Sequence, residues 1–192
     1  LKNAHTVSLD RAAAMEAVVG HLLGLGHRTF GLLAIAKAPA SRYDRLTGVQ
    51  AALRAHGLDF AACTVTLDHL HERNNDFDYG RKLAGSFLQL AHRPTALLAL
   101  NDEIAIGALR GLQEAGLKLP RDMAVTGFNN QPIAAMTTPT LTTVNQNIDT
   151  TIAAAAEILV AQLDAPPRAK PMVRMITGEL VVRESTGPAR TA

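Results

Sequence analysis

The chain has 192 residues, 47% of them hydrophobic, which is enough for one ordinary globular domain or a little more. Its 19 Lys and Arg nearly balance its 17 Asp and Glu, and a net charge of +2 excludes nucleic-acid binding through phosphate contacts alone. The single cysteine, Cys63, excludes an internal disulfide and a cysteine-based zinc site, fits a reducing cytoplasm, and is expected in the core.

The first ten residues, LKNAHTVSLD, lack the apolar stretch of a signal peptide and run directly into a strand pattern. We expect from this that an upstream segment is missing. No apolar run further along approaches the roughly 18 residues of a membrane span.

Short β-type runs then alternate with stretches of helical period, most of which end at a glycine. Strands are predicted at 6–9, 29–35, 63–67, 95–100, 123–128 and 141–144, and helices at 11–25, 42–56, 77–91, 102–115 and 147–163. The stretch DAPPRAKP (164–171) is predicted to be a proline-rich turn, and a last strand covers 172–185 with a bend at Gly178. Three strands are apolar almost throughout, which is typical of a parallel sheet covered by helices on both faces. The predicted fold is a doubly wound α/β domain.

The helix at 147–163, NIDTTIAAAAEILVAQL, is so rich in alanine and aliphatic residues that it should be buried on more than one side. The predicted sheet offers no partners for all of that surface. We therefore expect the helix to pack outside it.

Polar side chains follow the carboxyl ends of the strands, where ligands bind in open parallel sheets. They are Asp10, Ser41, Arg45, the loop 68–76, Asn101, Asp102, Asn129 and Asn130. Several of these residues are also good helix caps or turn formers, and we expect Asp102 to be the N-cap of helix 102–115, with the Asn101 amide facing the cleft. Together they predict a cleft for a small polar ligand.

Evidence for other chemistry is weaker. Gly24 and Gly26 follow a helix and precede a strand, the reverse of a phosphate-binding turn, so they are helix stops. His69 and His71 could hold a metal, but no third ligand is evident and a solvated loop is favoured; the remaining histidines are expected to be structural or surface residues. The sequence has no nucleophile elbow and no suitably spaced carboxylate pair, so we predict no catalytic centre, no metal site and no cofactor.

Five stretches, in this order, carry a family resemblance. They are HLLGLGHRTFGLLA, SRYDRLTGVQAALRAHGL, RPTALLALNDEIAIGALRGLQEAGLKLPRDMAVTGFNN, PTLTTVNQN and LVVRESTGP. They resemble the effector-binding region of the LacI/GalR family of bacterial transcription regulators over nearly the whole chain. The resemblance implies a periplasmic-binding-protein-like (type I) fold of two α/β lobes around a cleft of sugar or nucleoside size.

Under this resemblance residues 1–192 are a fragment of the effector-binding domain. Residues 6–140 and 172–186 belong mainly to the C-terminal lobe, and 141–165 is a crossover strand and helix of a mostly absent N-terminal lobe. That placement would explain the apolar helix at 147–163.

The resemblance also implies site residues. Arg45 matches an arginine that grips ligand hydroxyls or carboxylates, Asn101 a ligand-contacting asparagine, and Gln146 a glutamine on the hinge side. These three residues are expected to contact the ligand.

Two positions depart from the family pattern. Asn129 replaces the usual aspartate, and Asn75 stands near the place of a stacking aromatic residue, with Phe77 two positions further on. Losing the aspartate removes an anion near Arg45, which predicts a bias towards sugar acids over neutral hexoses unless Asp10, Asp76 or Asp102 restores the charge.

The implied function is a cytoplasmic, homodimeric, non-enzymatic regulator that binds a carbohydrate-like effector and contacts operator DNA through an N-terminal helix-turn-helix head outside this chain. Alternatives are a periplasmic sugar-binding protein of a transporter and an enzyme on a Rossmann-like fold. An upstream signal peptide would favour the first alternative, and turnover of a bound sugar the second.

Overall fold

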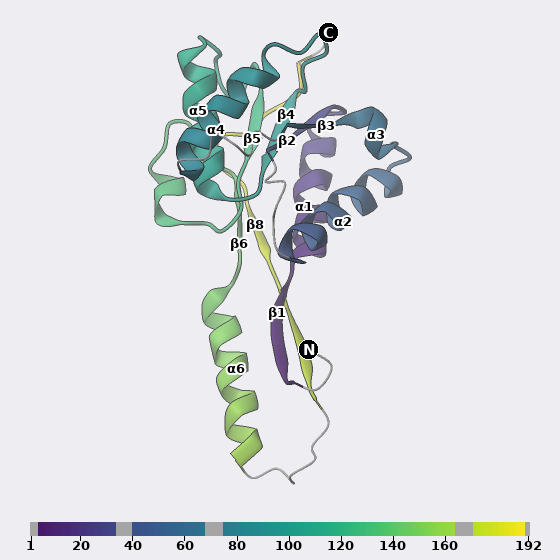
Figure 1. The fold of residues 1–192 in the computed structure, drawn as a ribbon, viewed down its shortest axis with the longest axis vertical. Helices are drawn as coiled ribbons and strands as arrows, with labels where there is room; N and C mark the ends of the chain where they lie inside the picture. Colours follow the sequence, from purple (N-terminus) through teal and green to yellow (C-terminus); the bar gives the residue numbers. More distant parts are fainter. Residues whose placement is uncertain (1–3, 34–39, 68–74, 164–170, 191–192) are drawn as a thin grey trace.

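In the computed structural model, residues 4–33, 40–67, 75–163 and 171–190 are described. The larger part is a parallel four-stranded sheet in the order β3-β2-β4-β5, formed by β2 (Phe30–Leu33), β3 (Thr64–Leu67), β4 (Ala96–Ala99) and β5 (Ala124–Thr126). Its main helices are α1 (Arg11–Gly24), α2 (Ala40–Ala55), α4 (Asp76–Phe87) and α5 (Asp102–Glu114). This confirms the predicted doubly wound α/β fold (Figure 1).

Each face of the sheet has its own apolar core, because successive strand residues point to opposite sides. Leu32 and Leu98 pack with α1 and α2, whereas Leu33 and Leu97 pack with α4 and α5. Both β2 and β4 are buried along their whole length, as their continuous apolar sequences predict.

A narrow stalk extends from this α/β unit (Figure 1). It contains β1 (Thr6–Asp10), which pairs in parallel with β7 (Val173–Thr177), and α6 (Ile148–Leu163), which lies against both strands. Between the stalk and the unit, β6 (Thr143–Asn145) pairs antiparallel with β8 (Glu179–Val181). Gly178 separates β7 from β8, as the predicted bend requires.

The expectation that residues 6–9 join the main sheet is wrong, because β1 pairs with β7 in a separate two-stranded sheet. The part of 172–186 that forms β7 likewise leaves the four-stranded sheet. The helix predicted at 147–163 lies in the stalk, outside the main sheet.

Two further differences are local. The four-residue helix α3 (Phe60–Cys63) was not predicted, since it is capped by Asp59 but too short to show a helical period. Cys63 ends α3 and is only half-buried, although it packs against the core between α1, α2 and the sheet.

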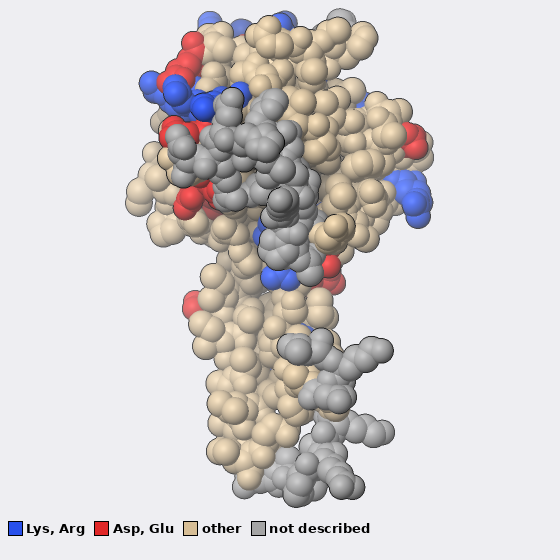
Figure 2. Space-filling view, in the orientation of Figure 1, with Lys and Arg blue, Asp and Glu red and all other residues tan. Residues whose placement is uncertain are grey.

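The outer face of α6 is apolar and exposed. Ile152, Leu159 and Val160 are each more than half exposed, and only Ala154 and Ile158 of the helix are buried. The expectation that this helix is buried on more than one side is therefore wrong for this chain, because β1 and β7 cover one side alone. The visible side of α6 has almost no atoms of charged residues (Figure 2). An apolar surface of this kind favours association.

We expect the 192-residue chain to self-associate through α6, and Leu159→Lys to raise the dissociation constant at least tenfold, since it removes roughly 2 kcal/mol of apolar burial. Sedimentation velocity over a concentration series measures this. Tyr43→Lys is the control, because Tyr43 is 70% exposed but lies on α2. An unchanged monomer fraction in Leu159→Lys would contradict the prediction.

Candidate ligand-binding site

Arg45 lies where the carboxyl ends of two strands meet. Its Nη1 donates a hydrogen bond of 2.9 Å to the carbonyl oxygen of Leu100, directly after β4. Its guanidinium also stacks 4.1 Å from the ring centre of Phe128, just beyond β5. These contacts fix the guanidinium at the rim where open parallel sheets bind ligands.

The Arg45 guanidinium is largely desolvated. Burial, with a smaller contribution from nearby Arg11, lowers the pKa of Arg45 to about 10, and Asp44 acts in the opposite direction. The group is therefore still a cation at neutral pH. Its Nε is buried and has no hydrogen-bond acceptor.

A cavity of about 110 Å³ opens beside Arg45. Most of the residues that line this cavity are apolar, and they come from the carboxyl halves of β2 and β4 and from helices on one side of the sheet. They comprise Met15, Leu32, Leu33, Leu46, Val49, Phe60, Leu98, Ala99 and Leu100, with Thr66 as the other polar residue.

Arg11, the first residue of α1, was not among the predicted site residues. Its Nη1 contacts the Ser8 hydroxyl at 3.3 Å and lies 3.8 Å from an Asp44 carboxylate oxygen. Arg11 lines a second cavity, of about 270 Å³, together with Asp10, Asp44 and Thr47. The sequence shows a charged residue at the start of this helix, but it does not indicate that the Arg11 side chain is partly buried.

Neither Asn101 nor Asp102 has the role expected for it. Asn101 is the N-cap of α5, with its Oδ1 accepting from the Ile104 N–H at 2.8 Å, and its Nδ2 donates to Asp76 at 2.6 Å. The prediction that Asp102 caps this helix is wrong. Asn101 follows Leu100, so it shares the rim with Arg45, although its amide is already hydrogen-bonded on both sides.

Asp102 is fully buried in the first turn of α5. One carboxylate oxygen accepts from the Thr143 hydroxyl and the other from the Gln131 N–H at 2.7 Å. Burial raises the pKa of Asp102, and these hydrogen bonds partly oppose the rise. The carboxylate thus ties α5 to β6 and to the segment after β5.

Asn129 and Gln146 lie together at the crossover to the stalk. The Gln146 Nε2 donates to the Asn129 Oδ1. Asn129 has a φ of 130° and Asn130 a φ of 52°, a region that asparagine tolerates better than most residues. The Asn130 side chain accepts from Arg183 at 2.7 Å, so both asparagines hold the crossover in place.

The other predicted site residues are mainly helix caps. Asp10 caps α1 by accepting from the Ala13 N–H, and Asn75 caps α4 by accepting from the Asp78 N–H. Phe77 lies in the first turn of α4 and is 38% exposed. Ser41 falls in the first turn of α2, where its side chain lies outside the described residues.

The histidines that the structure describes do not form a metal site. His27 is buried and bonds the Thr95 hydroxyl and the Gly187 carbonyl, a structural role. His69 and His71 lie outside the described residues. Within the described ranges, no group of three or more His, Cys, Asp or Glu side chains could hold a metal ion.

No helix in the described ranges is long and apolar enough to cross a membrane.

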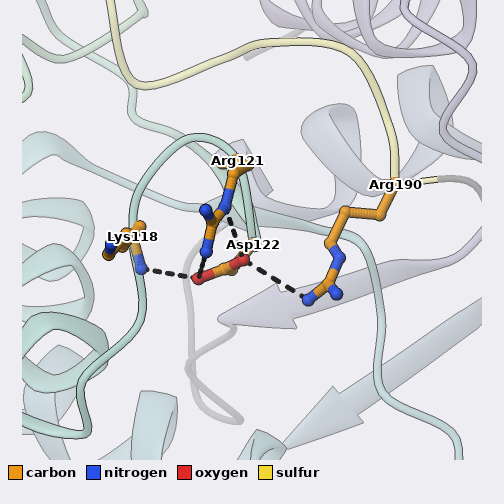
Figure 3. Close-up of polar contacts among 4 residues, drawn as sticks. All are labelled: Lys118, Arg121, Asp122 and Arg190. Carbon is orange, nitrogen blue, oxygen red and sulfur yellow. Dashed lines mark hydrogen bonds and ion pairs between the residues drawn. The ribbon is translucent and has the colours of Figure 1, made fainter.

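At the opposite end of the sheet, Asp122 anchors the C-terminal segment (Figure 3). Its carboxylate accepts from the Lys118 N–H at 2.7 Å and pairs with Arg121 and Arg190 at 3.2 and 3.3 Å. These hydrogen bonds and charges lower the pKa of Asp122. The cluster is a structural anchor, remote from the rim that carries Arg45.

Comparison with known proteins identifies the family. The family model of the periplasmic binding protein-like domain matches residues 19–186. The HTH-type transcriptional regulator MalR of Streptomyces coelicolor is 31% identical over 183 residues, which cover 95% of this chain and 52% of MalR. The chain thus spans about half the length of this relative.

Two solved structures share the fold. A LacI transcriptional regulator from a Rhodococcus species superposes with a TM-score of 0.84 at 29% identity, covering 98% of this chain and 67% of that one. A LacI family regulator from Enterococcus faecium with bound ribose gives a TM-score of 0.82 at 26% identity, covering 97% and 66%. Both match the periplasmic-binding-protein-like architecture seen here.

The family model covers most of the chain, and the ordered motifs, the doubly wound sheet and the separate stalk agree with it. The chain belongs to the LacI/GalR family of transcriptional regulators, and it matches the C-terminal region of the relatives named above.

Proposed function

We propose that this chain is the effector-sensing part of a cytoplasmic LacI-type regulator that binds a small polar metabolite of the sugar or sugar-acid class. The observation that carries the proposal is the partly buried Arg45 guanidinium, held beside a cavity at the carboxyl ends of β2 and β4. A ribose complex of a structural neighbour supports this ligand class.

The regulator would act as a homodimer on operator DNA through a helix-turn-helix part outside these 192 residues. The crossover elements give a physical route, since Gln146 and Thr143 connect the rim to the stalk through Asn129 and Asp102. A ligand that favours one arrangement of unit and stalk would shift the population between DNA-binding states.

We infer no catalytic activity. The relatives are named as transcriptional regulators, and the rim residues bind one another as caps and amide pairs. A periplasmic sugar-binding protein is the second candidate, since the family model also describes that domain. The gene upstream separates the two, because a helix-turn-helix supports the regulator and a cleavable signal peptide supports the binding protein.

A thermal-shift screen against sugars, sugar acids and nucleosides tests the ligand-binding proposal. A ligand from one of these classes, at a concentration 100 times its dissociation constant, should stabilise the chain by about 2.7 kcal/mol, which raises Tm by several degrees. Arg45→Gln should abolish the rise, whereas Arg110→Gln should preserve it, because Arg110 is an exposed side chain paired with Glu114 on α5. A screen with no rise in any class would contradict the proposal.

A further inference from the structure

Two buried side-chain polar atoms of the described residues lack a hydrogen-bond partner, and both are guanidinium Nε atoms. They belong to Arg11 and Arg45. Buried donors are nearly always paired, since an unpaired one loses its hydration without compensation. Two unpaired donors of the same kind in one region point to an acceptor that the described part of the chain does not supply.

The two arginines are brought together by close packing of α1 on α2. A Cβ placed on Gly48 would lie 2.2 Å from the carbonyl oxygen of Ala12, so the helices touch through backbone at this point. Arg11 immediately precedes Ala12, and Arg45 lies three residues before Gly48. Asp44, next to Arg45, is the carboxylate 3.8 Å from the Arg11 Nη1.

Negative charge on the described residues does not balance this pair. Asp44 has a half-exposed side chain, and among the described residues its ion-pair contact is the long one with Arg11; Asp10 caps α1. No ion pair joins Arg45 to a carboxylate among the described residues, and its Nη1 is used by a neutral carbonyl. Among the described residues, the half-exposed Asp44 carboxylate is thus the acidic group that acts on both guanidinium groups, by a long contact with Arg11 and through space on Arg45.

Both arginines also border open space. Arg11 lines the cavity of about 270 Å³ with Ser8 and Thr47, and Arg45 lines the largely apolar cavity of about 110 Å³. A carboxylate or phosphate between them could accept from each Nε, a charge-assisted hydrogen bond that guanidinium groups favour. Each arginine thus lies beside space that the organic part of such an anion could occupy.

We propose that the effector of this chain is a small organic anion whose carboxylate or phosphate oxygens accept hydrogen bonds from the Nε groups of both Arg11 and Arg45. This inference rests on the proposed effector-sensing function and adds Arg11 as a specificity-determining residue.

Isothermal titration of the chain at constant ionic strength tests it with matched probes. D-gluconate and D-glucose 6-phosphate are compared with D-glucose, and inorganic phosphate reports on the oxyanion alone. We expect at least one organic anion to bind at least tenfold more tightly than glucose. Gluconate and glucose 6-phosphate distinguish a carboxylate from a phosphate ligand.

The variants Arg11→Gln and Arg45→Gln should each weaken binding of that anion about tenfold or more, while Arg110→Gln should leave it unchanged. Arg11→Lys keeps the charge but lacks the Nε donor, so it should give an intermediate loss, and its fold is checked by circular dichroism. It replaces Arg11→Gln as the test if the latter does not fold.

Equal or tighter binding of glucose, or anion binding unaffected by both substitutions at Arg11, would overturn the inference and leave the proposed function standing. If no probe binds and the wider screen also finds no ligand, the proposed function fails as well.

Discussion

Replacing Gly107 with alanine is expected to destabilise the chain by about 3 kcal/mol, because the α4–α5 crossing has no room for a methyl group. A Cβ on Gly107 would lie 2.0 Å from the Phe77 carbonyl oxygen, and one on Gly80 would lie 2.0 Å from the Ile104 carbonyl oxygen. The obstacles are backbone atoms, so relief requires the two helices to separate. Urea denaturation of Gly107→Ala measures the loss.

Gly85→Ala is the matched control. Gly85 also lies within α4, but a Cβ there meets no atom within 4 Å. This substitution should leave stability unchanged or raise it by roughly 0.5–1 kcal/mol through helix propensity. Similar losses for Gly85→Ala and Gly107→Ala would show that steric contact between α4 and α5 is not the cause.

Asp102→Ala is the second substitution with a large expected effect, also about 3 kcal/mol. It leaves the buried Thr143 hydroxyl and the Gln131 N–H without their acceptor. Asp102→Asn keeps one acceptor oxygen and should lose less. Urea denaturation at pH 7 ranks the three proteins, and equal stability of wild type and Asp102→Ala would contradict the role given to Asp102.

The raised pKa of Asp102 also predicts that the stability difference between wild type and Asp102→Asn depends on pH. Because burial raises the pKa of Asp102 in the folded state, the folded chain binds this proton more readily than the unfolded chain does. The contribution of this group to stability is therefore greatest below the unfolded Asp pKa of about 3.9 and falls as pH rises through the higher folded value. The stability difference between wild type and Asp102→Asn should shrink or reverse in favour of the variant as pH rises through that window.

The sequence predicted the elements of the α/β unit well because their periods depend only on local pattern. Strands β2 and β4 are continuous apolar runs and α5 has a clear helical period, so each is found within a residue or two of its predicted bounds. The same pattern also indicated that 147–163 must pack outside the sheet.

Pairing partners and burial could not be predicted in this way. A strand pattern at 6–9 identifies a strand but not its neighbour, and β1 pairs with β7, more than 160 positions along the chain. Asn101 and Asp102 are adjacent residues with similar capping propensity, so local sequence does not decide which one caps α5. Arg11 was missed because its burial arises from the contact of α1 with α2, which no local pattern records.

We propose that a ligand bound at the Arg45 rim controls DNA binding. The most direct test is to measure the operator affinity of the full-length protein by fluorescence anisotropy, with and without the ligand that raises Tm. We expect the ligand to change the Kd for operator DNA by about 5- to 150-fold, the usual range for coupled sites. Arg45→Gln should keep the affinity of the unliganded protein and lose the response. An operator affinity that is the same with and without saturating ligand would show that the Arg45 site does not control DNA binding.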